Sequence, residues 1–316
     1  MRNFPKPVLV MSACLDLQPV RYNGEYIKDE FAIKLREYCR VVPVCPEISI
    51  GLGAPREKVI VYMKEDFRIF QPSTGMDLTD EMISFAESFL SSLERVDGFL
   101  LKGKSPSCGV SGTRIYKDPY GKQAFARGKG LFALKVLERF ESVPVEDEKR
   151  LRNVDLRDHF LIRLFAIADL RESLSKVEDV KDLVDFHRRY KYLIMAHSQQ
   201  KLKEMGRIVA NASKSLPDSL QTYQTLFLQM LKKRPSKGQH INVLLHIMGH
   251  ISDKINDTEK RHFFELVENY KRGHETLYTL LEILRTWTYL FGEEYLFDQV
   301  YLEPYPKDLR SVIINT

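Results

Sequence analysis

Short apolar runs alternate with amphipathic stretches through the first half of this chain. The apolar runs lie at residues 8–11, 41–44, 59–63 and 99–101, and they are rich in Val, Ile, Leu or Phe. Runs of this length and composition are typical of buried strands. The pattern therefore predicts four buried strands at these positions.

The stretches between these runs have helical periodicity. Apolar residues recur at three- and four-residue steps through 82–96, which predicts an amphipathic helix between the last two strands. Phe31, Leu35 and Tyr38 indicate a helix before the second strand, and the pattern at 131–140 indicates another after the fourth. Strands that alternate with helices favour an α/β domain with a mostly parallel sheet.

The second half of the chain has almost no strand signal. From about residue 156 onward the apolar residues recur at helical spacing, with one stripe at 183–194 and another at 244–251. This pattern predicts an all-α bundle. The expected fold class is thus an α/β N-terminal domain with a mostly parallel sheet, followed by an all-α C-terminal helical domain.

Length and charge refine this division. The chain has 316 residues, about two domains of ordinary size. The charged stretch at 146–152 has the composition of a linker, so we predict domains at 1–145 and 155–316. Lys and Arg exceed Asp and Glu by 21 − 18 = 3 in residues 1–145 and by 27 − 25 = 2 in residues 146–316. Since neither half is strongly basic, nucleic-acid binding would depend on local clusters of charge.

Composition also indicates the cellular compartment of the protein. No apolar run approaches the roughly 18 to 20 residues needed to cross a bilayer, so we expect no membrane partner. The apolar run near the N-terminus is shorter than the roughly 7 to 15 residues of a secretion signal. Four cysteines are too few for a disulfide scaffold in a chain of this size. We therefore expect a cytoplasmic protein with reduced thiols.

Three of the four cysteines follow a predicted strand. Cys14, Cys45 and Cys108 each lie in the loop after such a strand, and in an open parallel sheet these loops emerge at one edge. Three thiols that are distant in sequence are therefore expected to lie close in space. None has the Cys-x-x-Cys spacing of zinc ribbons or ferredoxins, so spacing alone leaves metal ligands and buried hydrophobes both open. Cys39, on the final turn of a predicted helix, is expected to be a buried hydrophobe.

Polar residues beside these cysteines favour a catalytic role for this region over a purely structural one. Glu47 stands two residues after Cys45, and Ser105 and Ser107 flank Cys108 among glycines. A carboxylate and hydroxyls beside thiolates would supply proton transfer and hydrogen bonds to a substrate. The alternatives are a capping or solvent-facing carboxylate and an ordinary Ser-Pro-Ser turn.

Four segments of the first half resemble the thiouracil desulfidase family in order and spacing. They are Cys14-Leu15 with 20–24, then 42–47, 51–56 and 103–109. The resemblance implies that Cys14, Cys45 and Cys108 hold a [4Fe–4S] cluster and that Glu47 and Ser105 act in catalysis. Two positions depart from the family pattern, because Asp16 replaces a usual glycine and Asn23 a usual aspartate. These departures leave the loop beside Cys14 in question.

The second half resembles an all-helical domain of unassigned function through segments 186–197, 240–250, 268–273 and 301–306. Proteins that join the two domains are similar to bacterial desulfidases that convert 4-thiouridine in tRNA to uridine. The resemblance therefore implies tRNA as a partner. Basic residues of the helical domain are the predicted RNA contacts: Arg188, Arg189, Lys191, Lys201 and Lys203. The alternative for these residues is a solvated helix face.

The implied reaction needs an iron without a protein ligand. Three thiolates for four irons leave one iron open as a Lewis acid, and soft thiocarbonyl sulfur suits it. Glu47 would then move a proton while water replaces sulfur, a hydrolysis without net electron transfer. Four further residues are predicted to bind the substrate: Ser12, Arg56, Lys104 and Ser107. The expected substrate is a thiolated pyrimidine, in tRNA or, alternatively, as free 2-thiouracil or a nucleotide. A second alternative is a non-catalytic zinc protein.

Overall fold

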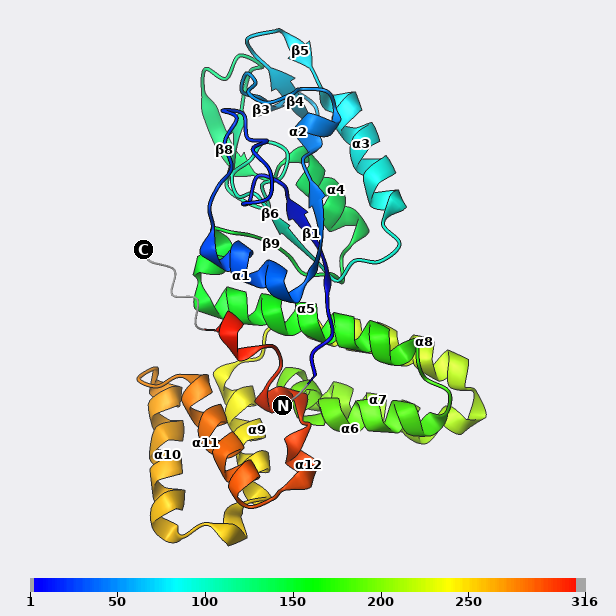
Figure 1. Ribbon diagram of the computed structural model, residues 1–316, viewed down its shortest axis with the longest axis vertical. Coiled ribbons are helices and arrows are strands. Elements are labelled where there is room, and N and C mark those ends of the chain that lie inside the picture. The colour runs from blue at the N-terminus through cyan, green and yellow to red at the C-terminus, as the bar shows by residue number, and fades with distance from the viewer. Residues whose placement is uncertain (1–2, 311–316) are drawn as a thin grey trace. The chain divides into compact units, whose positions relative to one another are not determined.

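The computed structural model describes residues 3–310, which form two compact units (Figure 1). The first, here called the α/β unit, comprises Pro5–Ala168 and the segment that begins at Tyr305. The second, the helical unit, comprises Asp169–Pro304 and the residues before Pro5. The division falls inside helix α5 (Val154–Leu174).

A four-stranded parallel sheet forms the centre of the α/β unit. The strand order is β2–β1–β6–β9, and all three neighbouring pairs run parallel. The strands are β1 (Val8–Ser12), β2 (Arg40–Val44), β6 (Gly98–Leu101) and β9 (Val145–Asp147). Every residue of β1 and β6 is buried, because helices cover both faces of the sheet. This arrangement confirms the predicted fold class and contains three of the four predicted strands, while the fourth, at 59–63, forms a strand in a second sheet.

Helices pack on both faces of this sheet (Figure 1). Helix α3 (Thr79–Ser92) buries Met82, Ala86 and Leu90 at four-residue steps, and it packs with α4 (Leu131–Arg139) in one core. Helix α1 (Glu30–Tyr38) lies on the other face with α5. The three predicted helices of this unit are therefore confirmed, and a short helix α2 (Pro46–Ser49) was not predicted.

A second sheet extends the α/β unit and was not predicted. Its order is β5–β4–β3–β7–β8, and only the β3–β7 pair is parallel. Its strands are β3 (Ile60–Met63), β4 (Phe67–Gln71), β5 (Met76–Asp77), β7 (Thr113–Tyr116) and β8 (Ala124–Gly128). The run at 59–63 was expected in the parallel sheet, which was wrong. Strands β5 and β8 are almost wholly exposed, so they carry no apolar signal.

The charged stretch at 146–152 is not a linker, which corrects a second expectation. Strand β9 pairs with β6 from Val145 to Asp147, and a short 3-10 helix, η1 (Arg150–Arg152), follows it. Asp147 and Glu148 are both buried. Buried charged residues need partners, so this stretch was misjudged from its composition alone.

Helices alone make up the helical unit from α6 to residue 304. They are α6 (Val180–His197), α7 (Gln199–Ala210), α8 (Leu216–Leu231), α9 (Lys237–Gly249), α10 (Asp257–Arg272), α11 (Leu277–Leu290) and α12 (Glu294–Phe297). Short 3-10 turns at Ala212–Lys214, Ser252–Lys254 and Val300–Leu302 join or follow them. Capping boxes begin α6, α9 and α10, which fixes where these helices start. The predicted stripe at 183–194 faces the interior, as do Leu244, Met248 and Ile251 of the second stripe, but Leu245 was also expected there and is 41% exposed.

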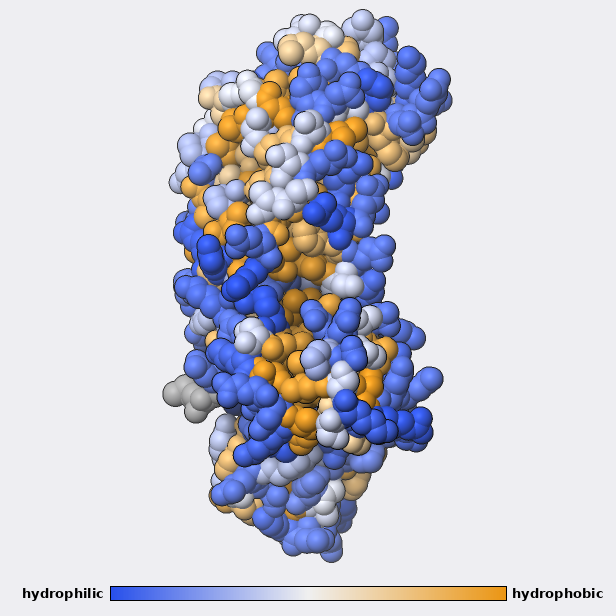
Figure 2. All heavy atoms as spheres, turned by 90° about the vertical axis from the view of Figure 1, so that its right-hand side faces the viewer, coloured by the Kyte–Doolittle hydropathy of each residue, from blue (hydrophilic) through white to orange (hydrophobic). Residues whose placement is uncertain are grey.

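Hydrophilic side chains cover much of the face shown in Figure 2, with hydrophobic ones gathered in patches between them. Within residues 3–310, no helix combines the length and the apolar character that spanning a bilayer requires.

Candidate active site

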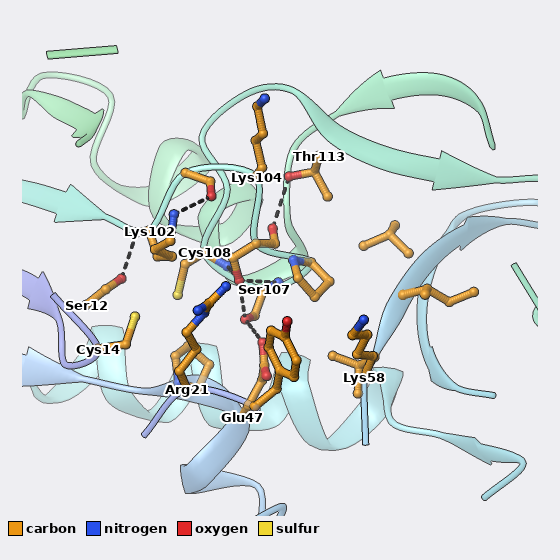
Figure 3. A pocket seen from close by; sticks show the side chains of 18 of the residues that line it. Ser12, Cys14, Arg21, Glu47, Lys58, Lys102, Lys104, Ser107, Cys108 and Thr113 are labelled. Atoms are coloured by element: carbon orange, nitrogen blue, oxygen red, sulfur yellow. Dashed lines mark hydrogen bonds between the residues drawn. The ribbon is translucent and has the colours of Figure 1, made fainter. Parts of the chain in front are cut away.

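The carboxyl ends of β1, β2 and β6 open on one cavity of about 460 Å³ (Figure 3). Its lining includes Cys14, two residues after β1, Cys45, directly after β2, and Cys108, in the loop after β6. The parallel sheet therefore brings the three thiols to one edge, as the strand–loop pattern predicts. Cys39 lies at the end of α1, is buried, and is not among the lining residues.

Burial makes all three cavity thiols poor thiolates on their own. It raises the pKa of Cys14 to about 12, with a smaller contribution from neighbouring Cys45. Burial also raises the pKa of Cys45 and of Cys108. The ammonium of Lys102 opposes the shift at Cys14, and the hydroxyl of Ser12 opposes it at Cys108. Positive charge in the cavity, such as metal ions supply, would favour the thiolate forms.

Within the described part of the chain, the three thiols line the cavity without forming a single-ion site. Among the residues that the structure describes, no three His, Cys, Asp or Glu side chains are arranged to hold a single metal ion. One zinc ion needs its ligands around one centre, whereas an iron–sulfur cluster takes each thiolate on a separate iron. Three soft donors that line one cavity have the chemistry that an iron–sulfur cluster takes, and their role as ligands stays a prediction.

Glu47 lies in this cavity with both carboxylate oxygens engaged. It stands in the first turn of α2, behind Pro46, and is 8% exposed. Oε2 accepts hydrogen bonds from Arg56 Nε at 2.8 Å and Nη2 at 2.6 Å. Oε1 accepts one from the Ser107 hydroxyl at 2.6 Å. The charged partner and the three donors offset the cost of burying a carboxylate.

A second serine extends this hydrogen-bond chain. Ser105 Oγ lies 3.1 Å from Ser107 Oγ, and it also accepts from the backbone N–H groups of Ser107 and Cys108. Since the single hydroxyl proton of Ser107 points to Glu47, the Ser105 hydroxyl donates to Ser107. The sequence singled out Ser105 for catalysis and Ser107 for substrate binding. In the structure Ser107 contacts Glu47, and Ser105 lies one hydrogen bond further away.

The loop that carries Ser105 and Ser107 depends on glycines at two points where other atoms of the chain come close. A Cβ atom on Gly109 would lie 2.1 Å from Thr113 Oγ1 and 2.7 Å from Ser105 O. One on Gly130 would lie 2.4 Å from Ser107 O. Neither contact is tolerable, and each involves atoms that the loop's own hydrogen bonds hold in place. Glycine at both positions therefore lets the loop fold back under the cavity.

A buried ion pair on the other side of the cavity was missed from the sequence. Glu148, directly after β9, binds the ammonium of Lys102 through Oε1 and accepts from Gly103 N through Oε2 at 2.7 Å. The backbone N–H of Lys102 donates to Ser12 Oγ at 2.9 Å. This network ties β1, β6 and β9 together beside Cys14. The position of Lys102 at the end of an apolar strand was the available signal, but its partner lay in the misassigned linker.

The other predicted substrate contacts line the same cavity. Lys104 lies there with a left-handed backbone, at φ 61°. Arg56 also lines it, but its side chain is 6% exposed and donates to Val20 O and Gly53 O besides Glu47. Arg56 is thus positioned to hold Glu47, and its contact with a substrate stays a prediction, as do those of Ser12, Lys104 and Ser107.

The cavity wall is strongly cationic. Its lining contains one acidic residue among those the structure describes, Glu47, and eight basic ones: Arg21, Arg56, Lys58, Lys102, Lys104, Arg114, Arg127 and Lys149. Burial lowers the pKa of Lys149, and repulsion from Lys102, and to a lesser degree from Lys104, lowers it further. Positive charge is therefore in excess on this wall. The net charge of residues 1–145, counted from the sequence, could not reveal this local excess.

The predicted RNA contacts of the helical unit are mostly neutralised. The guanidinium of Arg188 donates to both carboxylate oxygens of Asp298, at 3.0 and 2.6 Å. Two more of these side chains form ion pairs, Arg189 with Asp169 at 3.2 Å and Lys201 with Glu204 at 2.8 Å. Lys191 lies over the rings of Tyr192 and Tyr295, and Lys203 is exposed. RNA binding by this set remains a prediction.

Two family models match the chain. The model described as 2-thiouracil desulfurase matches residues 9–148, and a protein of unknown function, DUF1722, matches residues 191–306. The uncharacterized protein YbgA of Escherichia coli (strain K12) is 30% identical over 152 residues, which are 48% of this chain and 90% of YbgA. The uncharacterized protein YbbK of Bacillus subtilis (strain 168) is 30% identical over 110 residues, which are 32% of this chain and 73% of YbbK.

Among solved structures, the [4Fe-4S]-dependent thiouracil desulfidase TudS is 32% identical to this chain. The match covers 46% of this chain and 93% of that one, with a TM-score of 0.37. The chain therefore belongs to the 2-thiouracil desulfurase family, whose model spans residues 9–148, and carries a DUF1722 region at residues 191–306.

Proposed function

We propose that this protein is a [4Fe–4S]-dependent desulfidase that hydrolyses the thiocarbonyl of a thiolated uracil, with 4-thiouridine in tRNA as its main substrate. The observation that carries the proposal is the meeting of three thiols with the Glu47–Ser107–Ser105 chain in one cavity. The family match and the [4Fe-4S]-dependent activity named for TudS support the reaction type.

Cys14, Cys45 and Cys108 would hold the cluster. Their thiolates are the soft ligands that iron–sulfur clusters take, and three of them for four irons leave one coordination position without a protein ligand. When bound, such a group supplies a Lewis acid for soft sulfur. A cluster of this kind needs a reducing compartment, so we place the protein in the cytoplasm.

Glu47 would handle the proton of the attacking water. The water oxygen forms a bond to the ring carbon, the carbon–sulfur bond breaks, and the protons of water end on the released sulfide. No group is oxidised or reduced. Oε1 of Glu47 accepts the proton, and the Ser105 and Ser107 hydroxyls relay it toward this oxygen, because their hydrogen bonds run from Ser105 to Ser107 to Glu47. Arg56 keeps the carboxylate aligned for this transfer.

The cationic wall favours a substrate with phosphate groups. A free base offers no charge to these side chains, whereas a nucleotide or an RNA strand does. Free thiouracil remains the alternative. A structural zinc site is less well supported, because the family match is to a desulfurase. In tRNA, the thiolated nucleotide would have to leave its stack to reach the cavity.

The test is sulfide release by the anaerobically reconstituted protein. It is incubated in parallel with tRNA that contains 4-thiouridine and with free 4-thiouracil and 2-thiouracil. We expect sulfide and an equal amount of uridine from the tRNA. Sulfide from a free base alone would contradict the RNA substrate, and no sulfide from any of the three would contradict the desulfidase assignment.

A further inference from the structure

Two arginines lie opposite each other at the cavity wall. Strands β7 and β8 are antiparallel, and their register places Arg114 directly across from Arg127. Both side chains are exposed, and both line the cavity that contains the three thiols. Neither forms an ion pair with an acidic side chain in the part of the chain that the structure describes.

Such a pair of like charges is unfavourable, and an anion between its members would relieve the repulsion. Residues directly opposite in an antiparallel pair have Cβ atoms about 4.5–5.5 Å apart, and like charges there destabilise the sheet. The neighbouring residues of β7 alternate regularly, since Thr113 and Ile115 are buried while Arg114 faces out. A β-bulge beside the pair, between Ile115 and Tyr116, adjusts the direction of the strand at this point.

Edge protection is the competing explanation. Strand β8 is at the edge of its sheet, and charged side chains on edge strands oppose aggregation. That role would be met by a cation anywhere along β8, and it requires neither two arginines in register nor their place on the cavity wall. The planar guanidinium group also binds phosphate oxygens in pairs, which lysine does not.

We propose that Arg114 and Arg127 form a phosphate fork that binds the phosphate ester of the substrate nucleotide. The thiols and the fork line one cavity, so the base and the phosphate of one nucleotide are recognised by two parts of the same site. This inference rests on the proposed function and specifies its substrate class: thiolated nucleotides, either free or within RNA, in preference to free bases.

Binding of sulfur-free ligands tests the fork independently of catalysis. Affinities of the reconstituted protein for uridine and for uridine 5′-monophosphate are measured by calorimetry, in the wild type and in the double variant Arg114→Gln/Arg127→Gln. We expect the wild type to prefer the monophosphate and the double variant to lose about tenfold or more of that preference. Lys122→Gln is the matched control, because Lys122 is exposed on the same hairpin outside the cavity lining, and it should keep the preference.

Equal wild-type affinity for the two ligands would overturn the fork. So would an unchanged preference in the double variant, which would leave edge protection as the role of the pair, or an equal loss for both ligands, which would indicate a structural effect. A titration with unmodified tRNA separates the sources of phosphate. Weaker tRNA binding by the double variant would show that the fork contacts the RNA backbone. A loss of affinity for the monophosphate alone would show that the ligand is a free nucleotide.

Discussion

The two units of this protein treat their cationic side chains differently. In the helical unit, Arg188 is held by Asp298 and Lys201 by Glu204. Around the cavity of the α/β unit, five cations form no ion pair with an acid in residues 3–310: Lys58, Lys104, Arg114, Arg127 and Lys149. The two halves carry nearly equal net charge. The placement of carboxylates, rather than the number of basic residues, therefore distinguishes the two units, and we expect an anion to bind most favourably at the cavity.

The same contrast applies to polar chemistry. The α/β unit lines one cavity with three thiols, the buried carboxylate of Glu47, the buried Ser107 and the half-buried Ser105. The helical unit pairs half-buried histidines with tyrosine hydroxyls, as in His187 with Tyr223 at 3.1 Å and His240 with Tyr301 at 2.8 Å. We therefore expect changes in the first unit to affect the reaction and changes in the second to affect stability. The following predictions test this separation.

The largest effect is expected at Glu47. Glu47→Gln keeps the shape of the side chain but removes the proton acceptor, so kcat for desulfidation should fall by about 10²- to 10⁴-fold. Iron content, measured alongside, should stay at the wild-type level. Glu57→Gln is the control, since Glu57 is exposed. A Glu47→Gln protein with full activity would remove Glu47 from the reaction.

Replacing Ser107 should lower kcat more than replacing Ser105. Ser107 donates directly to the carboxylate, and a hydrogen bond to a charged group contributes about 1.5–3 kcal/mol. Ser107→Ala should therefore lower kcat by roughly 10- to 100-fold. Ser105→Ala should lower it less in the initial rates, because Ser105 reaches Glu47 only through Ser107. A larger loss in Ser105→Ala would show that Ser105 acts on the substrate itself.

Acid should weaken the helical unit. Burial lowers the pKa of His187 and of His240 to about 4, from an ordinary value of 6.5. The unfolded state therefore binds protons first as pH falls, so the stabilisation is complete above pH 6.5 and is lost between pH 6.5 and pH 4. At pH 5 each histidine should cost about 1–2 kcal/mol of unfolding free energy.

Urea unfolding followed by circular dichroism at pH 7 and pH 5 measures this loss. His187→Gln removes one titrating group, so the pH 5 penalty should shrink in that variant. An equal penalty with and without His187 would show that other groups cause the acid sensitivity.

The smallest effects are expected for tRNA binding, when one lysine is replaced in each unit. Lys104→Gln in the cavity should weaken tRNA binding by about fivefold and lower the slope of log K against log salt concentration by about 1. Lys201→Gln should change neither, because Lys201 already pairs with Glu204. Filter binding at several salt concentrations gives both numbers. The opposite ranking would place the main RNA surface on the helical unit.

The sequence predicts the centre of the α/β unit well, because the strands of the first sheet are buried on both faces. Val8–Ser12 is apolar almost throughout, so its boundaries, and hence the place of Cys14, follow from composition. Strand β8 has no buried residue, so no periodicity reveals it, and β7 alternates over only four residues, of which Thr113 and Arg114 are polar. The register that sets Arg114 opposite Arg127 depends on this second sheet and is invisible in the sequence.

Side-chain partners were harder to predict than side-chain positions. Cys14, Cys45, Cys108 and Glu47 meet in one cavity because parallel strands end at one edge. The bond from Ser107 to Glu47, by contrast, depends on how a glycine-rich loop folds back. The charged composition around Glu148 indicated a linker, yet its carboxylate pairs with Lys102 in the interior. Composition cannot distinguish a solvated charge from a paired one.

Iron content is the most direct test of the central claim, which is that Cys14, Cys45 and Cys108 together hold a cluster. Each is changed to serine, the proteins are reconstituted anaerobically, and iron and acid-labile sulfide are counted per chain. We predict about four irons in the wild type and in Cys39→Ser, since Cys39 lies outside the cavity. Each of the other three variants should lose most of its iron. A colourless wild type with one zinc ion, or an equal loss in Cys39→Ser, would contradict this claim.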